Sequence, residues 1–218
     1  MSREKNIIRI SKDKSIIIAA RTISMMFTPF YLPLVGLIVL FTFSYLSLLP
    51  AGYRFMVLSL VYLFTILMPT FLIRLYRNYH GWTLFELSSK RRRLVPYLIS
   101  ICSYLLCIQV LNALNIFHFV SSIVFAALMV QIVCAIINVW WKISTHTAAI
   151  GGVAGALLVF AEIFSFNPVC WLCLTLIVAG LLGSARMFLR QHTLAQVCVG
   201  FLVGFLIGGT GIFYFAID

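Results

Sequence analysis

Long apolar runs and short polar stretches alternate along this chain from residue 31 almost to its end. A helix needs about 20 mostly apolar residues to cross the hydrocarbon core of a bilayer. Seven runs approach that length and are predicted to be membrane-spanning helices, at residues 31–49, 53–74, 96–113, 118–139, 147–165, 168–184 and 194–216. The weakest division lies at residues 114–117, around Asn115, so the pattern predicts six or seven spans.

These runs favour helices over the strands of a membrane barrel. Barrel strands alternate apolar and polar residues over roughly 10 positions, whereas a stretch such as SSIVFAALMVQIVCAII does not alternate. Only helices and closed barrels satisfy every backbone group in lipid. With 63% hydrophobic and 10% charged residues, the chain is predicted to be an integral membrane protein of the all-α class, a polytopic transmembrane helical bundle.

The same pattern divides the chain into three parts. Residues 1–30 are predicted to be a basic, interfacial N-terminal segment, because their start, MSREKNIIRISKDK, is too polar and too mixed in charge for a signal peptide. Residues 31–87 hold two N-terminal spans and a polar connection, and residues 88–218 hold the core of the remaining spans.

Basic residues gather on one side of the predicted bundle. The chain has 16 Lys and Arg against 5 Asp and Glu, a net charge of +11, and every Lys and Arg except Arg54 falls on the side of the N-terminal segment. The positive-inside rule places that side in the cytoplasm, where anionic lipid headgroups attract basic residues. Because these charges lie at span ends, the pattern favours the bilayer rather than nucleic acid as the partner.

Three polar clusters interrupt the apolar pattern on this side. They are SSKRRRLVPY (88–97), WKISTHTAAIGG (141–152) and ARMFLRQHT (185–193), and two predicted spans separate each cluster from the next. An even number of crossings places all three on one face of the membrane. Together they offer the basic side chains of Lys90, Arg93, Lys142, His146, Arg186, Arg190 and His192.

These residue types suit the binding and transfer of a phosphate group. Arginine binds phosphate oxygens through charge-assisted hydrogen bonds, and a helix that starts at Ser144, Thr145 and His146 offers backbone N–H groups to an anion. Two histidines can serve as nucleophile and proton donor. The second and third clusters hold no carboxylate, so neither a metal nor another cofactor is expected. Alternatively, basic residues at span ends simply anchor helices at the interface.

Small residues recur at helical spacing beside two of the clusters. Positions four apart share one helix face, and small residues let helices approach closely in a membrane. The spacing from His192 and from Ser144 therefore predicts two closely packed helices whose polar ends lie together. Their facing positions are Gln196, Gly200, Gly204 and Gly208 in the last span and Ala148, Gly151, Gly152 and Gly155 in the fifth.

The second and third clusters resemble two motifs of a known family, P-S-G-H and S-R-x5-H-x3-D. Arg186 and His192 keep the R-x5-H spacing of the latter. Ser144 and His146 match the serine and the histidine of the former.

The first cluster is similar to the remaining motif, K-x6-R-P, in a compressed form. Lys90, Arg93 and Pro96 give the spacing K-x2-R-x2-P. Residues 88–205 thus resemble the type-2 phosphatidic acid phosphatase superfamily, the lipid phosphate phosphatases related to vanadium haloperoxidases. The resemblance implies a haloperoxidase-like phosphatase core in a divergent, bacterial-type membrane member.

The resemblance also implies a role for each matching residue. His192 would attack phosphorus and become a phosphohistidine, and His146 would protonate the leaving group. The phosphate and its transition-state charge would be held by Lys90, Arg93, Ser144, Arg186 and the amide of Thr145. No metal or other cofactor is implied, and the lipid tail would enter laterally from the bilayer.

Four positions depart from the family pattern. Ile143 and Thr145 replace the proline and the glycine of P-S-G-H, and Ala185 replaces the serine before the arginine of S-R-x5-H-x3-D. Gln196 stands where the family has an aspartate that orients the nucleophilic histidine. Glutamine accepts a hydrogen bond but carries no charge, so it can orient His192 without compensating the charge of the ring. Either slower turnover or help from another carboxylate is expected, and Glu86 is the nearby candidate on the same side.

The leading hypothesis is a metal-independent hydrolase, a phosphatase of membrane lipid metabolism that removes a monophosphate or diphosphate. Candidate substrates are phosphatidic acid, phosphatidylglycerol phosphate, polyprenyl diphosphate and lipid A phosphate. The expected location is the bacterial inner (plasma) membrane with the site on the cytoplasmic side, and the oligomeric state is left open. The alternatives are a catalytically impaired member that binds anionic lipid and a phospholipid carrier or transporter.

Overall fold

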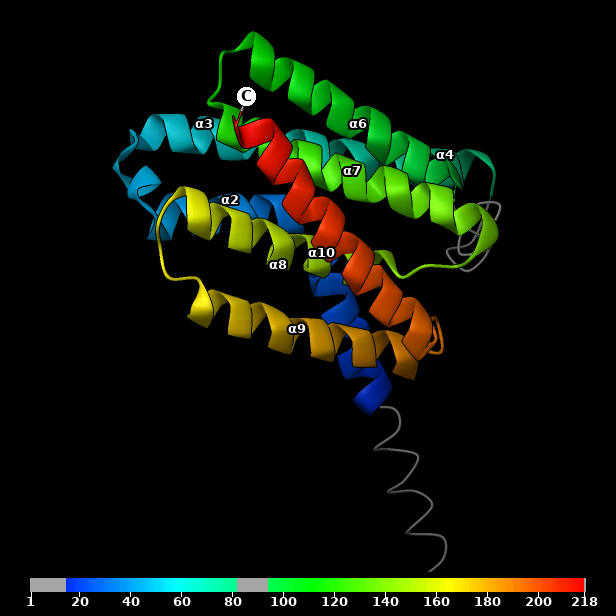
Figure 1. Ribbon diagram of the computed structural model, residues 1–218. Helices are drawn as coiled ribbons and strands as arrows, with labels where there is room; N and C mark the ends of the chain where they lie inside the picture. The colour runs from blue at the N-terminus through cyan, green and yellow to red at the C-terminus, as the bar shows by residue number, and fades with distance from the viewer. Residues whose placement is uncertain (1–14, 82–93, 218) are drawn as a thin grey trace, which may run out of the picture.

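A computed structural model describes residues 15–81 and 94–217 of the chain (Figure 1). The regular elements in these two ranges are all helical. The α-helices are α2 (Leu32–Phe43), α3 (Ala51–Tyr62), α4 (Met68–Tyr79), α6 (Leu94–Ala113), α7 (His118–Trp140), α8 (Thr145–Ile163), α9 (Val169–Phe188) and α10 (Leu194–Ile217). A shorter apolar helix, Ser15–Met26, precedes them.

Six helices in the described part of the chain are long and apolar enough to cross a membrane. Five are α6 to α10, and the sixth is the continuous helix Ala51–Tyr79, in which the π-helical turn η2 (Leu63–Leu67) joins α3 to α4. The predicted division at residues 114–117 is confirmed, because α6 ends at Ala113 and Asn115 adopts a left-handed conformation with φ of 51°. The predicted polytopic helical bundle is likewise confirmed.

The first predicted span, residues 31–49, is replaced by a shorter helix. α2 has 12 residues, about 18 Å of helix, against a hydrocarbon core of about 30 Å. The extended residue Ser44 ends it: its hydroxyl donates to the Leu40 carbonyl at 2.6 Å and accepts the Leu46 N–H at 3.2 Å. The 3-10 turn η1 (Tyr45–Leu48) follows. A serine that binds nearby backbone groups thus interrupts the apolar run.

α8 and α10 form the most extensive helix contact of the bundle, and α10 crosses both α8 and α7 (Figure 1). Glycines permit this approach. A Cβ atom added at Gly204 would overlap the Ala148 carbonyl oxygen, and one added at Gly208 would lie 2.6 Å from the Gly152 Cα. The predicted pair of closely packed, glycine-faced helices is therefore confirmed.

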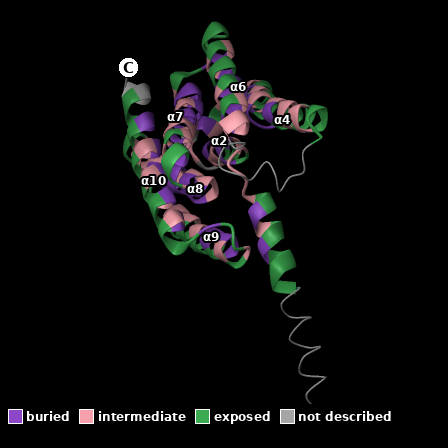
Figure 2. Ribbon diagram, turned by 90° about the vertical axis from the view of Figure 1, so that its right-hand side faces the viewer, coloured by how far each residue is buried: buried purple, intermediate pink, exposed green. Residues whose placement is uncertain are grey.

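The N-terminal segment reaches the bundle near α8 and α9. Figure 2 shows the helix Ser15–Met26 on the opposite side of α9 from α10. Ile23 and Phe27 pack against a buried apolar cluster built by α2, α8 and α9. The interfacial position of residues 1–30 stays a prediction, but the last part of this segment also contacts the protein core.

Candidate active site

The second and third predicted clusters meet at one end of the bundle. The second forms the start of α8, and the third forms the end of α9 and the loop before α10. A backbone hydrogen bond joins the two regions, because the Ser144 N–H donates to the Gln196 carbonyl at 3.4 Å. Gly200 keeps the helices at this spacing, since an added Cβ would lie 2.7 Å from the Ser144 carbonyl oxygen. The prediction that these two clusters share one face is confirmed.

His192 lies immediately before α10, beside a capped helix start. Thr193 and Gln196 form a capping box, in which the Thr193 hydroxyl accepts the Gln196 N–H at 3.4 Å and Gln196 Oε1 accepts the Thr193 N–H at 3.3 Å. The same Oε1 atom lies 3.1 Å from His192 Nδ1. The helix cap therefore also orients the imidazole ring, which is 7% exposed.

This geometry assigns the tautomer of His192. A backbone N–H can only donate, so the Gln196 side-chain atom that meets the Thr193 N–H is the amide oxygen and not the nitrogen. An amide oxygen can only accept, so His192 Nδ1 carries a proton. In the neutral ring the lone pair then belongs to Nε2. Gln196 thus sets both the orientation of the ring and the nitrogen that carries the lone pair.

The start of α8 combines backbone donors with a buried hydroxyl group. Ser144 is the N-cap residue, and its carbonyl accepts the Ala148 N–H at 3.0 Å and the Thr147 hydroxyl at 3.1 Å. Its own hydroxyl is buried and has no hydrogen-bond partner among the described residues. Thr145 and His146 follow as the first helical residues. Since the first N–H groups of a helix lack intrahelical partners, this end of α8 suits an anion.

Arg186 is buried at the end of α9, with 7% of its side chain exposed. Its Nη1 donates a hydrogen bond of 2.8 Å to the Ser24 hydroxyl, so a residue of the N-terminal segment reaches the candidate site. Arg190 follows one turn later and is exposed, with a left-handed φ of 51°. Of the two arginines near the end of α9, Arg186 is therefore buried and Arg190 lies at the surface. Exposure of Arg190 favours a role as an interfacial anchor.

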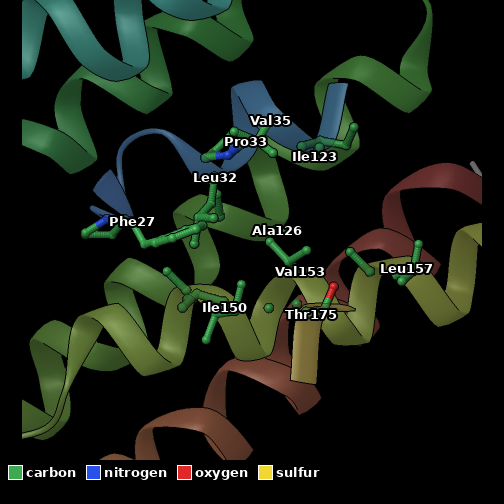
Figure 3. A pocket seen from close by; sticks show the side chains of 18 of the residues that line it. Phe27, Leu32, Pro33, Val35, Ile123, Ala126, Ile150, Val153, Leu157 and Thr175 are labelled. Carbon is green, nitrogen blue, oxygen red and sulfur yellow. The ribbon is translucent and has the colours of Figure 1, made fainter. Parts of the chain in front are cut away.

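A cavity of about 620 Å³ extends from this end into the bundle (Figure 3). Thr145, His146 and Arg186 line it, together with Pro96 and Tyr97 at the start of α6. The described end of the first cluster therefore lies beside the same cavity as the other two clusters.

Most of the cavity wall is apolar. Figure 3 shows Phe27 and Leu32 across from Ile150. α8 lines the cavity from Thr145 to Phe160, which is about 22 Å along the helix axis and most of the ~30 Å thickness of a hydrocarbon core. A polar head and a long apolar body give the cavity the character of an amphiphilic ligand site.

Not every predicted site residue is placed by this geometry. Glu86, Lys90 and Arg93 lie outside the described residues. His192 is not part of the described cavity wall; it is joined to the cavity's polar head through Gln196 and the start of α8. Within residues 15–81 and 94–217, no three His, Cys, Asp or Glu side chains are grouped closely enough to hold a metal ion.

Two residues at the site, Thr193 and Ser24, were not predicted from the sequence. The spacing T-x-x-Q directly before an apolar run is the signature of a capping box, so the role of Thr193 as a helix cap could have been predicted. Ser24 carries no such signal, because its partner Arg186 lies 162 residues away in the chain.

The six membrane-length helices among the described residues define the class of the molecule, a polytopic helical membrane protein. At one end of the bundle, a mostly apolar cavity is headed by side chains whose chemistry suits an anionic group. Residues 138–216, a segment that includes α8, α9 and nearly all of α10, match the model of the PAP2 superfamily, and this match supports membership in that superfamily. Membership indicates phosphatase activity on phosphate esters. Neither a search of curated proteins nor a search of solved structures found a match.

Proposed function

We propose that this protein is a lipid phosphate phosphatase that works through a phosphohistidine intermediate and needs no metal ion. The observation that carries the proposal is the hydrogen bond between Gln196 Oε1 and His192 Nδ1, close to a cavity that is headed by His146 and Arg186 and is otherwise mostly apolar. A histidine with its lone pair on Nε2 is a competent nucleophile, and an apolar cavity accommodates a lipid tail.

The first half of the proposed reaction transfers the phosphoryl group to the enzyme. His192 Nε2 attacks phosphorus, forming an N–P bond as the bond between phosphorus and the lipid oxygen breaks. His146 donates a proton to the departing oxygen, so the lipid leaves as an alcohol or, from a diphosphate, as a monophosphate. Arg186, Ser144 and the Thr145 amide bind the remaining phosphate oxygens as their charge grows, with Lys90 and Arg93 as further proposed ligands.

The second half releases inorganic phosphate. His146, now neutral, takes a proton from water as the water oxygen attacks phosphorus and the N–P bond breaks. His192 returns to its starting tautomer, with Nδ1–H still held by Gln196. Because the amide is neutral, the positive charge that develops on the ring when the N–P bond forms, and that lasts until this bond breaks, is not compensated at Nδ1. Turnover is therefore expected to be slower than with a carboxylate there.

The apolar cavity supports a lipid as the substrate. Its walls include residues of α2, α7, α8 and α9. Side chains such as Val35 and Leu174 both line it and are exposed at the bundle surface. In a bilayer such a wall offers a lateral path for a tail. The charge pattern of the sequence supports a site on the cytoplasmic face of a bacterial inner membrane.

The test is phosphate release by the purified protein in EDTA, measured with phosphatidic acid, phosphatidylglycerol phosphate, polyprenyl diphosphate and lipid A phosphate. His192→Ala is expected to lower activity at least about 1,000-fold, since it removes the nucleophile. His118→Ala is the matched control, because His118 is exposed and starts α7, about 33 Å from the other end of that helix. Full activity in His192→Ala would overturn the proposal.

A second candidate function follows from the neutral side chain at Gln196. A protein that binds anionic lipid without hydrolysing it would keep the anion site and the cavity and lack turnover. It predicts saturable binding of phosphatidic acid to the native protein with no phosphate released from any of the four substrates in EDTA.

A further inference from the structure

One polar contact ties the N-terminal segment to the candidate phosphate site. Ser24 and Arg186 are each 7% exposed, and the arginine Nη1 donates to the serine hydroxyl at 2.8 Å. The helix that carries Ser24 is otherwise largely exposed: within Ser15–Met26 only Ala20 and Ser24, four positions apart on one face, are buried. The buried face of this helix is thus centred on its contact with Arg186.

The hydrogen bonding of Ser24 is unusual for a hydroxyl within a helix. Thr22 on the same helix donates to the Ile18 carbonyl four residues earlier, at 3.0 Å, as helical Ser and Thr often do. Ser24 makes no such bond within the described residues, and its oxygen accepts from Arg186 instead. Its side chain is therefore turned away from its own helix and toward the guanidinium group.

A guanidinium group is planar and presents its N–H donors in a rigid fork. A hydrogen bond from Nη1 to a buried oxygen restricts the rotation of the whole planar group, and with it the directions that its other donors can take. Arg186 also lines the polar head of the cavity, and bidentate binding of a phosphate depends on the orientation of this plane. An unheld arginine would have to order its side chain during binding, at a cost in affinity.

We propose that Ser24 is a positioning residue of the phosphate site, which holds Arg186 in the orientation that binds phosphate. The N-terminal segment is then part of the active site rather than only a membrane anchor. The residues that follow support this: Phe27, Thr28 and Pro29 line the same cavity, so one short stretch meets both its polar head and its apolar wall. The inference deepens the proposed function and rests on it for the role of Arg186.

The test compares three variants of the full-length protein in detergent. Ser24→Ala removes the acceptor, Ser24→Thr keeps a hydroxyl, and Thr22→Ala removes an exposed hydroxyl from the same helix. The readouts are KM, kcat and the competitive inhibition constant of inorganic phosphate. Ser24→Ala is expected to raise KM and the inhibition constant about tenfold, as for the loss of one hydrogen bond to a charged group, while kcat changes less. Ser24→Thr should restore most of the loss, and Thr22→Ala should match the native protein.

A purely structural contact predicts a different outcome. If Ser24 only fastens the N-terminal helix, Ser24→Ala lowers the thermal stability and the amount of active protein, and the inhibition constant of phosphate stays at its native value. That result, or equal effects of Ser24→Ala and Thr22→Ala, would overturn the inference.

A binding measurement separates this inference from the proposed function. Inorganic phosphate that binds the folded state raises its unfolding temperature, whether or not lipid is hydrolysed. If the native protein hydrolyses no lipid phosphate but is stabilised by phosphate, and Ser24→Ala needs about tenfold more phosphate for the same stabilisation, the proposed function fails and the positioning role stands. If the native protein hydrolyses lipid phosphate and Ser24→Ala responds to phosphate as the native protein does, only the positioning role fails.

Discussion

Glycine residues of α8 and α10, in the C-terminal half of the molecule, occupy the opposite environment to those of α2 and α3 in the N-terminal half. In α8 and α10, a Cβ atom added at Gly151, Gly155 or Gly204 would overlap backbone oxygen of the facing helix. In α2 and α3, a Cβ atom added at Gly36 or Gly52 would meet nothing within 4 Å. The first group is required by helix contact, whereas the second group faces open space.

This difference in packing corresponds to a difference in what the two halves contribute to the candidate site. The C-terminal half brings backbones together, and the polar groups at the ends of those helices, among them Ser144 and Gln196, are held through backbone hydrogen bonds. The N-terminal half contributes a broken span, α2, and side chains such as Leu32 to the wall of the cavity. We therefore expect the C-terminal half to supply the reacting groups, and α2 of the N-terminal half to contribute to tail selection rather than to the phosphate chemistry.

The largest expected effect is on the helix contact of the C-terminal half. Gly204→Ala should destabilise the protein by about 3 kcal/mol, because the added methyl overlaps the Ala148 carbonyl oxygen and a packed backbone cannot easily yield. Thermal or denaturant-induced unfolding in detergent measures it. Gly52→Ala is the matched control from the N-terminal half and should be neutral or slightly stabilising, since alanine favours a helix over glycine. Equal stability of the two variants would remove the distinction between the halves.

A smaller effect is expected at the polar end of that contact. Gln196→Leu should reduce kcat/KM by about 10- to 100-fold, because it removes the acceptor that orients a functional histidine, and it should cost about 1 kcal/mol of stability through the lost helix cap. Gln196→Glu keeps the acceptor for both His192 and the Thr193 N–H and adds a negative charge beside the ring. Initial rates of phosphate release over a range of substrate concentrations give kcat/KM for both variants, and thermal unfolding in detergent measures the loss of stability.

The Gln196→Glu variant tests the charge argument. Activity at or above the native level is expected, because a carboxylate compensates the positive charge that develops on His192 during transfer. A loss as large as that of Gln196→Leu would mean that Gln196 acts in some way other than by accepting the Nδ1 proton.

Most structural features of the C-terminal half could be predicted from the sequence, but fewer of those of the N-terminal half could. Span lengths and the four-residue glycine spacing predicted the contact of α8 with α10, because each depends on local composition and helix periodicity. They also predicted the meeting of the clusters around His146 and His192, since an even number of spans returns the chain to the same face.

Features that depend on single side-chain contacts escaped prediction. The run at residues 31–49 is apolar enough to span, but the Ser44 hydroxyl competes for backbone groups and ends α2 early. Ser24 has no periodic or motif signal, because its hydrogen bond to Arg186 depends on how the N-terminal helix packs on the folded bundle. Such contacts are tertiary and leave no mark in a hydropathy pattern.

The smallest expected effect concerns the tail-binding role of the N-terminal half. Gly36 lines the cavity, and an added Cβ there meets nothing within 4 Å, so Gly36→Leu should occupy cavity space without disturbing the fold. KM for a long-chain lipid phosphate should rise about three- to tenfold, on the scale of the ~1–3 kcal/mol by which apolar pockets discriminate, and turnover of the soluble ester p-nitrophenyl phosphate should not change. Gly52→Leu, in the same half but outside the cavity wall, should leave both substrates unaffected. If Gly36→Leu slows both substrates equally, α2 acts on the phosphate chemistry as well as on tail binding, and the expected difference between α2 and the C-terminal half is lost.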